Sequence, residues 1–217
     1  LRVLAHCSGD ERLTQAFNEG KDIHTVVAAR VHDVSEDDVT PEMRRRAKAV
    51  NFGIIYGQQA YGLSRQIDAS VDEARGFIDD YFTQYPTVKE FIGSTIEQAR
   101  DDGYVKTLAG RIRYVPGIRS SGSRRSAAER IAVNTVIQGT AADLIKRAMI
   151  RIHDELPGVS ERSNMLLQIH DELVFEVPDE ELDEVTDFVT DRMSDAMDLA
   201  VPLKVDVATG KNWEEAK

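Results

Sequence analysis

The chain has few of the residues that mark secreted or membrane proteins. Only one of its 217 residues, Cys7, is a cysteine, so it cannot form an internal disulfide and suits a reducing cytosol. It has no Cys/His cluster, which argues against a structural zinc site. No apolar run approaches the roughly 18 residues that span a bilayer, and no signal peptide opens the chain. We therefore expect a cytoplasmic globular protein.

Acidic residues outnumber basic ones, 38 to 27, but the positive charge is concentrated. The formal net charge is −11, yet residues 43–67 carry a net +5 and residues 103–134 a net +6. Residues 152–217 carry −13. A protein that is acidic overall can hold a polyanion where its cations gather, so the composition does not exclude nucleic acid. The alternative is that acidic outer helices simply keep the protein soluble.

The hydrophobic pattern predicts several amphipathic helices. Ser8 and Glu11 have capping-box spacing, as do Ser70 and Glu73, so each pair predicts a helix start. Further helices are expected over residues 24–31, 40–56, 87–103, 124–156 and 179–200. Gly139 predicts a break or bend in the longest of them. The helix after Ser70 has an apolar stripe, interpreted as core, made of Ala74, Phe77, Ile78, Tyr81, Phe82 and Tyr85.

Short β-branched runs predict two hairpins. Residues 104–108 and 111–115 flank an Ala-Gly turn, and residues 165–169 and 173–177 flank a polar one. Residues 203–207 alternate as a strand that could join the second hairpin. The expected fold class is therefore α+β, an antiparallel sheet backed by helices plus a mostly helical subdomain.

The segment 41–56 carries the most informative pattern. Thr40 suits the N-cap of a helix, Pro41 suits its first turn, and Gly57 suits its end, so the segment is expected to be a helix. Arg44, Lys48 and Phe52 are four residues apart and share one face, and Tyr56 follows one turn later. Cations followed by rings suit a nucleoside triphosphate, because cations meet phosphate oxygens and rings meet flat groups. The alternative is a solvated basic face beside two core aromatics.

The turn of the second hairpin carries two carboxylates. Asp171 and Glu172 follow His170 between two hydrophobic strands, which would hold them firmly. Carboxylates at such a place suit Mg²⁺, whose remaining ligands are substrate phosphates and water. The alternative is an ordinary polar turn, since Asp favours turns for its own hydrogen bonds.

Taken together, three segments closely resemble family A DNA polymerases, the bacterial DNA polymerase I type. Residues 44–57 resemble the fingers helix of that family, and residues 168–176 resemble its catalytic hairpin. Residues 130–143 resemble the helix that holds primer and template. Residues 20–24 and 210–213 match as well, so the resemblance covers essentially the whole chain.

The resemblance implies a nucleotide site on the fingers helix. The incoming dNTP triphosphate would be contacted by Arg44, Lys48 and His24. Lys48 would also donate a proton to the leaving pyrophosphate, which suits a cation held near developing negative charge. Phe52 would pack against the sugar, a position where phenylalanine is associated with discrimination against dideoxy sugars. Tyr56, with Gly57 beside it, would lie by the template base.

The same resemblance implies contacts to DNA and metal. The duplex near the primer end would be gripped by one helix face that carries Arg130, Asn134 and Gln138. His170 would contact the primer end. Asp171 would be a catalytic ligand of Mg²⁺ in a two-metal site, with Glu172 as an acidic neighbour and second candidate ligand.

One departure from the family pattern matters. The family places a second metal-binding aspartate in a strand just before the segment that residues 1–6 match, and this chain starts at Leu1. We therefore expect a fragment with a palm-side helix in residues 1–20, mainly fingers in residues 21–122 and palm in residues 123–217. Its metal site would be incomplete, and the fragment alone is expected to be inactive although the parent protein extends primers.

The expected function is template-directed DNA synthesis, in which a primer 3′-hydroxyl attacks a dNTP and pyrophosphate leaves. The expected partners are primer–template DNA and dNTP, with no membrane, and the protein is expected to be monomeric in a bacterial or phage-infected cytosol. Two other functions stay open. One is a non-catalytic DNA-binding module that retains the polymerase scaffold, and the other is a metal-dependent phosphohydrolase.

Overall fold

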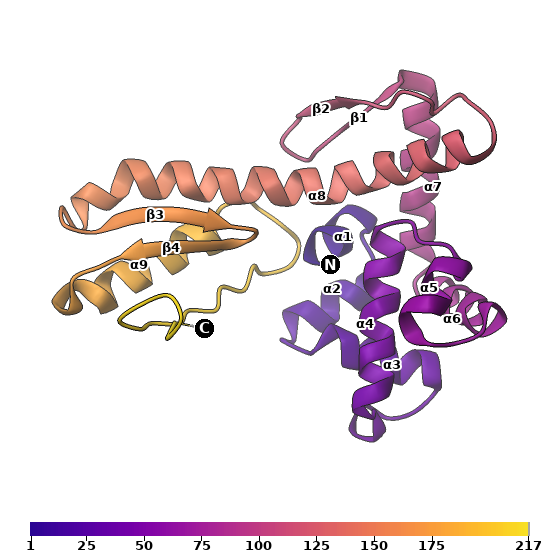
Figure 1. The fold of residues 1–217 in the computed structure, drawn as a ribbon, viewed down its shortest axis with the longest axis horizontal. Helices are drawn as coiled ribbons and strands as arrows, with labels where there is room; N and C mark the ends of the chain where they lie inside the picture. Colours follow the sequence, from indigo (N-terminus) through magenta and orange to yellow (C-terminus); the bar gives the residue numbers. More distant parts are fainter. Residues whose placement is uncertain (217) are drawn as a thin grey trace. The chain divides into compact units, whose positions relative to one another are not determined.

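The computed structural model describes residues 1–216 and confirms an α+β fold dominated by helices (Figure 1). The chain divides into two units between Ala141 and Ala142, inside the longest helix, α8 (Gly122–Glu155). Among the described residues each unit has one antiparallel sheet of two strands. No helix in this described part combines the length and apolar character needed to cross a membrane. The expected division of the chain at residues 20 and 122 stays a prediction.

The first unit opens with three short helices, α1 (Arg2–Ser8), α2 (Glu11–Asn18) and α3 (Ile23–His32). The expected capping box at Ser8 is wrong, because Ser8 ends α1 instead of starting α2. Asp10 caps α2, and its carboxylate accepts the backbone N–H groups of Arg12 at 3.1 Å and Leu13 at 3.0 Å. Asp10 lies directly before the helix, so it satisfies the orphan donors that Ser8 is too far back to reach.

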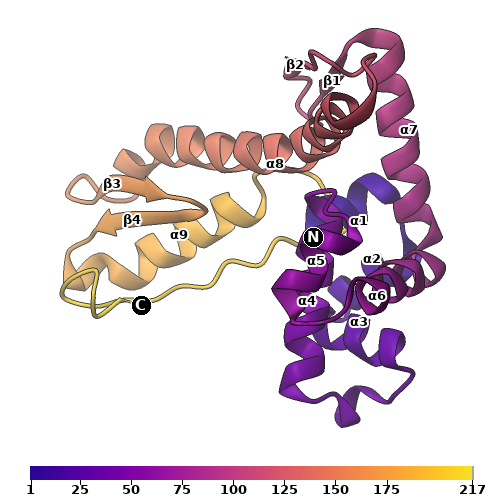
Figure 2. The ribbon, with the colours of Figure 1, turned by 45° about the vertical axis from the view of Figure 1, so that its right-hand side comes forward.

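A short 3-10 turn, η1 (Glu36–Asp38), leads to α4 (Pro41–Ile55), and Figure 2 shows α4 beside α3. The expected start of α4 is confirmed, since the Thr40 hydroxyl accepts the Met43 N–H at 3.2 Å. Three more helices follow: α5 (Ala60–Ile67), α6 (Val71–Gln84) and α7 (Pro86–Asp102). The capping box of Ser70 and Glu73 at the start of α6 is present in both directions.

The apolar stripe of α6 forms core, as its helical period predicts. Ala74, Tyr81 and Tyr85 are fully buried, and Phe77 and Phe82 are half-buried. The Tyr81 and Tyr85 rings pack with centroids 4.8 Å apart. These aromatic residues stabilise the first unit and offer no surface for stacking a base.

The first hairpin joins β1 (Tyr104–Lys106) to β2 (Ile112–Tyr114), shorter than expected but in the expected place. It packs on α8, where a core cluster contains Ala99, Val105, Val115, Ile118, Ala128 and Ala132. The break expected at Gly139 is wrong, because α8 continues through it, and the alternative of a bend there stays a prediction. A Cβ on Gly139 would lie 2.7 Å from Cγ2 of Thr107, so the glycine serves a close approach of the hairpin to the helix.

The second unit contains the other hairpin and two flanking helices. After η2 (Leu156–Gly158), β3 (Asn164–Ile169) pairs with β4 (Glu172–Glu176), followed by η3 (Asp179–Glu181) and α9 (Leu182–Ser194). Leu173 and Phe175 of β4 pack against a buried cluster from α8 and α9 that includes Ile152, Val185 and Val189. One face of the hairpin is therefore backed by helices, as the sequence pattern predicts.

Two expectations for this unit are wrong. The expected helix to residue 200 ends at Ser194, where further acidic residues, Asp195 and Asp198, would meet the negative end of the helix dipole. Residues 203–207 form no strand, although they alternate. Alternation specifies which face would be buried, but a strand also needs a partner backbone, and β3 and β4 pair only with each other in the described chain.

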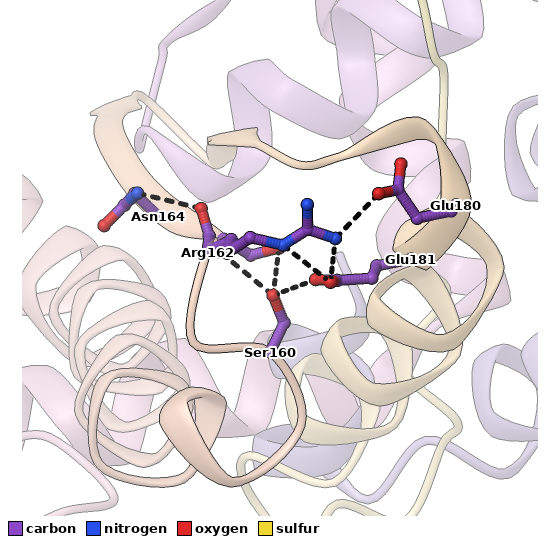
Figure 3. A network of polar contacts seen from close by, with 6 residues as sticks. Ser160, Arg162, Asn164, Glu180 and Glu181 are labelled. Atoms are coloured by element: carbon purple, nitrogen blue, oxygen red, sulfur yellow. Dashed lines mark hydrogen bonds and ion pairs between the residues drawn. The ribbon is translucent and has the colours of Figure 1, made fainter.

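A polar network closes the loop between η2 and β3 (Figure 3). The Ser160 hydroxyl bonds to Ser163 Oγ at 2.7 Å and donates a short hydrogen bond to Glu181. Arg162 binds Glu180 at 2.8 Å and Glu181 at 2.5 Å. These contacts tie the start of the hairpin to η3.

Candidate functional site

The exposed face of α4 carries the residues that the sequence predicts. Arg44, Lys48 and Phe52 are exposed, whereas Val50 and Ile54 on the opposite side are buried. Eight residues of helix separate Arg44 from Phe52, or about 12 Å at 1.5 Å per residue. That length suits the row of phosphates and sugar in a nucleoside triphosphate.

The two rings at the end of α4 are available to a ligand. Phe52 is 36% exposed and Tyr56 is 47% exposed, so the alternative that both are core aromatics is wrong. Their ring centroids lie 6.5 Å apart with an interplanar angle of 22°. Tyr56 caps the helix, and Gly57 follows with φ 61°, a left-handed conformation that suits glycine.

His24 joins this face from the neighbouring helix α3. Its ring centroid lies 6.0 Å from that of Phe52, and Asn51 Nδ2 lies 3.0 Å from His24 Nδ1. Burial lowers the pKa of His24, and the cations Arg44 and Lys48 lower it further against the opposing charge of Asp22. The imidazole is therefore neutral at neutral pH, with the Asn51 amide donating to Nδ1 and the proton on Nε2.

Arg44 is held by an acidic residue to which the sequence pattern assigned no role. Its Nε donates to Asp22 Oδ2 at 2.7 Å, and Nη2 lies 2.7 Å from the same oxygen. Partial burial opposes ionisation of Asp22, but hydrogen bonds from Arg44 and from the backbone N–H groups of His24 and Thr25 outweigh it and lower its pKa. The available signal was its position directly before a helix, which marks an N-cap.

Gly57 lies against Arg130, which brings two of the predicted DNA-binding positions together within the first unit. A Cβ on Gly57 would lie 2.8 Å from Cγ of Arg130. The neighbouring Glu129 binds Arg100 at 2.5 Å and Arg125 at 3.5 Å. The exposed Arg130 guanidinium therefore lies near the turn that carries Tyr56.

One face of α8 continues from Arg130 through Asn134 to Gln138. Arg130 and Gln138 are exposed, and Asn134 is half-buried. The Asn134 Oδ1 atom is buried and has no hydrogen-bond partner among the described residues. A buried acceptor without a donor costs free energy.

In the second unit, His170 and Asp171 form a two-residue turn between β3 and β4. His170 adopts a left-handed conformation with φ 53°, and its carbonyl accepts Gln168 Nε2 at 2.8 Å. Glu172 is the first residue of β4 and pairs with Ile169. His170, Asp171 and Glu172 are all exposed, so the carboxylates are held at the end of a paired hairpin and are open to a ligand.

These carboxylates do not make a complete metal site by themselves. Within residues 1–216 no three His, Cys, Asp or Glu side chains gather closely enough to hold a metal ion. Asp171 and Glu172 have the hard oxygen donors that Mg²⁺ prefers, but they are two adjacent residues. The two carboxylates are therefore the right type of ligand for Mg²⁺, but they do not form a full ligand set.

Comparison with known proteins places the chain in a family. Residues 1–215 match the model of DNA polymerase family A, and the chain belongs to that family. It is 51% identical to DNA polymerase I of Caldicellulosiruptor bescii over 218 residues, covering all of this chain and 26% of that protein. It is 48% identical to DNA polymerase I of Bacillus caldotenax, covering 25% of it.

A solved structure agrees with this assignment. The POL domain of Pol1 from M. smegmatis, in complex with DNA primer–template and dNTP, matches 99% of this chain with 45% identity and a TM-score of 0.94. The match covers 38% of that chain. The present chain thus spans about a quarter of the length of the curated relatives above.

Proposed function

We propose that this chain is part of a DNA-directed DNA polymerase that transfers a nucleotidyl group from a dNTP to a primer 3′-hydroxyl. The hydroxyl oxygen would attack the α-phosphorus, and pyrophosphate would leave in line. The observation that carries this proposal is the exposed row of Arg44, Lys48 and Phe52 with the neutral His24 beside it. The names of the relatives, and the DNA and dNTP bound by the matched structure, support it.

Each residue of the α4 face has a proposed role in nucleotide binding. Arg44, Lys48 and His24 contact the triphosphate, and Lys48 protonates the leaving pyrophosphate. Phe52 packs on the deoxyribose. Tyr56 and Gly57 lie beside the template base, which their place at the end of α4 supports.

The α8 face has a proposed role in holding the primer–template. Arg130 suits phosphate or a minor-groove acceptor, and the amides of Asn134 and Gln138 suit minor-groove and sugar atoms. The exposure of Arg130 and Gln138 on this face supports the role. Such contacts grip DNA with little regard to sequence, as copying any template requires.

We further propose that Asp171 binds Mg²⁺, with Glu172 as the neighbouring candidate ligand, and that His170 contacts the primer end. When bound, two Mg²⁺ ions would supply the charge that stabilises the attacking and leaving oxygens. The described residues offer only part of the ligand set. The 217-residue chain alone is therefore expected to be inactive.

Primer extension tests this proposal. The complete polymerase that carries this chain, mixed with primer–template, dNTPs and Mg²⁺, is expected to lengthen the primer and release pyrophosphate, whereas the 217-residue chain alone is not. Binding of DNA without extension by the complete protein would favour a non-catalytic binding module. Release of nucleoside monophosphate or phosphate would favour a phosphohydrolase. Robust synthesis by the 217-residue chain would contradict the expectation of an incomplete metal site.

We also propose that the protein acts as a monomer in the bacterial or phage-infected cytosol. Size-exclusion chromatography with light scattering at working concentration would test the first part. A dimer that persists on dilution would contradict it. Fractionation of the source cells would test the second part.

A further inference from the structure

We propose that Asp22 is a positioning residue for the incoming nucleotide, because it orients the Arg44 guanidinium that receives the triphosphate. The inference rests on the polymerase function proposed above. It assigns a role to a residue that would not touch the nucleotide itself. The contact that carries it joins the N-terminus of α3 to the first half of α4.

The two contacts from Arg44 to Asp22 use only one edge of the guanidinium. Nε and Nη2 both reach the same oxygen, Oδ2, at 2.7 Å. A guanidinium has five N–H donors in a rigid fork, so the Nη1 group and one hydrogen of Nη2 are left for another acceptor. Two parallel donors of this kind match two oxygens of a phosphate.

Asp22 is itself fixed, and this makes it suitable as a support. Its other oxygen, Oδ1, accepts the backbone N–H of His24 at 2.9 Å and of Thr25 at 3.4 Å, which caps α3. If the carboxylate turned away, these backbone N–H groups at the start of α3 would lose their acceptor. Because His24 lies in the same turn, one carboxylate fixes the backbone that carries His24 and the side chain of Arg44.

If only its charge mattered, Asp22 would weaken dNTP binding instead of supporting it. A carboxylate close to a phosphate-binding cation repels the phosphate, so removing its charge should tighten dNTP binding if electrostatics decided the outcome. If orientation of Arg44 decides it, removing the charge should weaken dNTP binding. The sign of the change therefore separates a positioning role from a simple charge effect.

The test is Asp22→Asn in the complete polymerase that carries this chain. Asparagine caps helices as well as aspartate does, but it lacks the charge that holds Arg44. The KM for dNTP is expected to rise about tenfold, the scale of one charge-assisted hydrogen bond, while kcat changes less than about threefold. The Kd for primer–template and the melting temperature are expected to stay the same. Asp22→Ser, which also caps, is expected to act alike.

Glu42→Gln is the matched control. Like Asp22→Asn it removes one negative charge, but it lies on α4 and breaks contacts to Arg45 and Arg46 instead of Arg44. It is expected to leave the KM for dNTP unchanged or slightly lower. In an Arg44→Ala background, Asp22→Asn should no longer raise the KM. An unchanged or lowered KM for Asp22→Asn, or an equal rise without Arg44, would overturn the proposal. A wild-type protein that incorporates no dNTP would instead overturn the proposed function.

Discussion

The contact between Gly139 and Thr107 gives a prediction in which two effects of known sign oppose each other. Replacing a glycine inside a helix by alanine normally stabilises it by roughly 0.5–1 kcal/mol, because less backbone entropy is lost. At Gly139 the new methyl would lie 2.7 Å from Cγ2 of Thr107, well inside the ordinary contact distance. Thr107 is buried and lies on the hairpin next to α8, so it has little room to move.

Overpacking of this kind costs about 1–3 kcal/mol, which exceeds the gain in helix propensity. Gly139→Ala is therefore expected to lower the free energy of unfolding by roughly 0.5–2 kcal/mol. Thr107→Ser removes the clashing methyl but keeps the hydroxyl that accepts the Arg111 N–H at 3.1 Å. In that background Gly139→Ala should be neutral or stabilising, so the two substitutions should be strongly coupled.

Urea unfolding followed by circular dichroism would measure these changes. Gly93→Ala in α7 is the matched control. A Cβ at residue 93 would have no atom within 4 Å, so this substitution should stabilise the protein. The reasoning would be refuted if Gly139→Ala stabilised the protein as much as Gly93→Ala. It would also be refuted if the effect of Gly139→Ala did not depend on Thr107.

Three further predictions concern the candidate site. Lys48→Ala should lower kcat about 10²–10³-fold with folding unchanged, as loss of a group that stabilises developing charge does, and single-turnover extension would measure it. Arg130→Ala should weaken primer–template binding at every sequence tested, and a plot of log Kd against log salt should lose about one unit of slope if the contact is to phosphate. His24 has a folded-state pKa below its ordinary 6.5, so the unfolded chain binds the proton more readily and stability should fall as the pH drops below about 6.5. His24→Gln should remove that part of the fall, and urea titrations at pH 7.5 and 5.5 would show a smaller difference than in the wild type.

Local patterns in the sequence predicted the elements that depend on neighbouring residues. The α4 helix with its Thr40 cap, the capping box at Ser70 and the β3–β4 hairpin are each specified within one short stretch of the chain, and all are confirmed. The exposed face of α4 follows from the same short-range period. For this reason the grouping of Arg44, Lys48 and Phe52 was visible in the sequence alone.

Two of the failures involve distant partners, and one involves two neighbouring candidate caps. Glycine is needed at residue 139 because Thr107, 32 residues earlier, lies against it. No local sequence pattern indicates such a contact. The ion pair of Asp22 with Arg44 joins residues 22 positions apart. At Ser8 the spacing of a capping box was present, but Ser8 ends α1, and Asp10 caps α2 by accepting the N–H groups of Arg12 and Leu13.

The division between the two units falls inside an unbroken helix, and this affects any attempt to separate them. Continuous α8 offers no exposed loop near residue 141 for a protease to cut, whereas the turn before Gly122 does. A nick in that turn would leave Arg130, Asn134 and Gln138 on the C-terminal piece of the chain. Limited proteolysis would therefore cut the chain inside the first unit, and neither product would correspond to a unit of the fold.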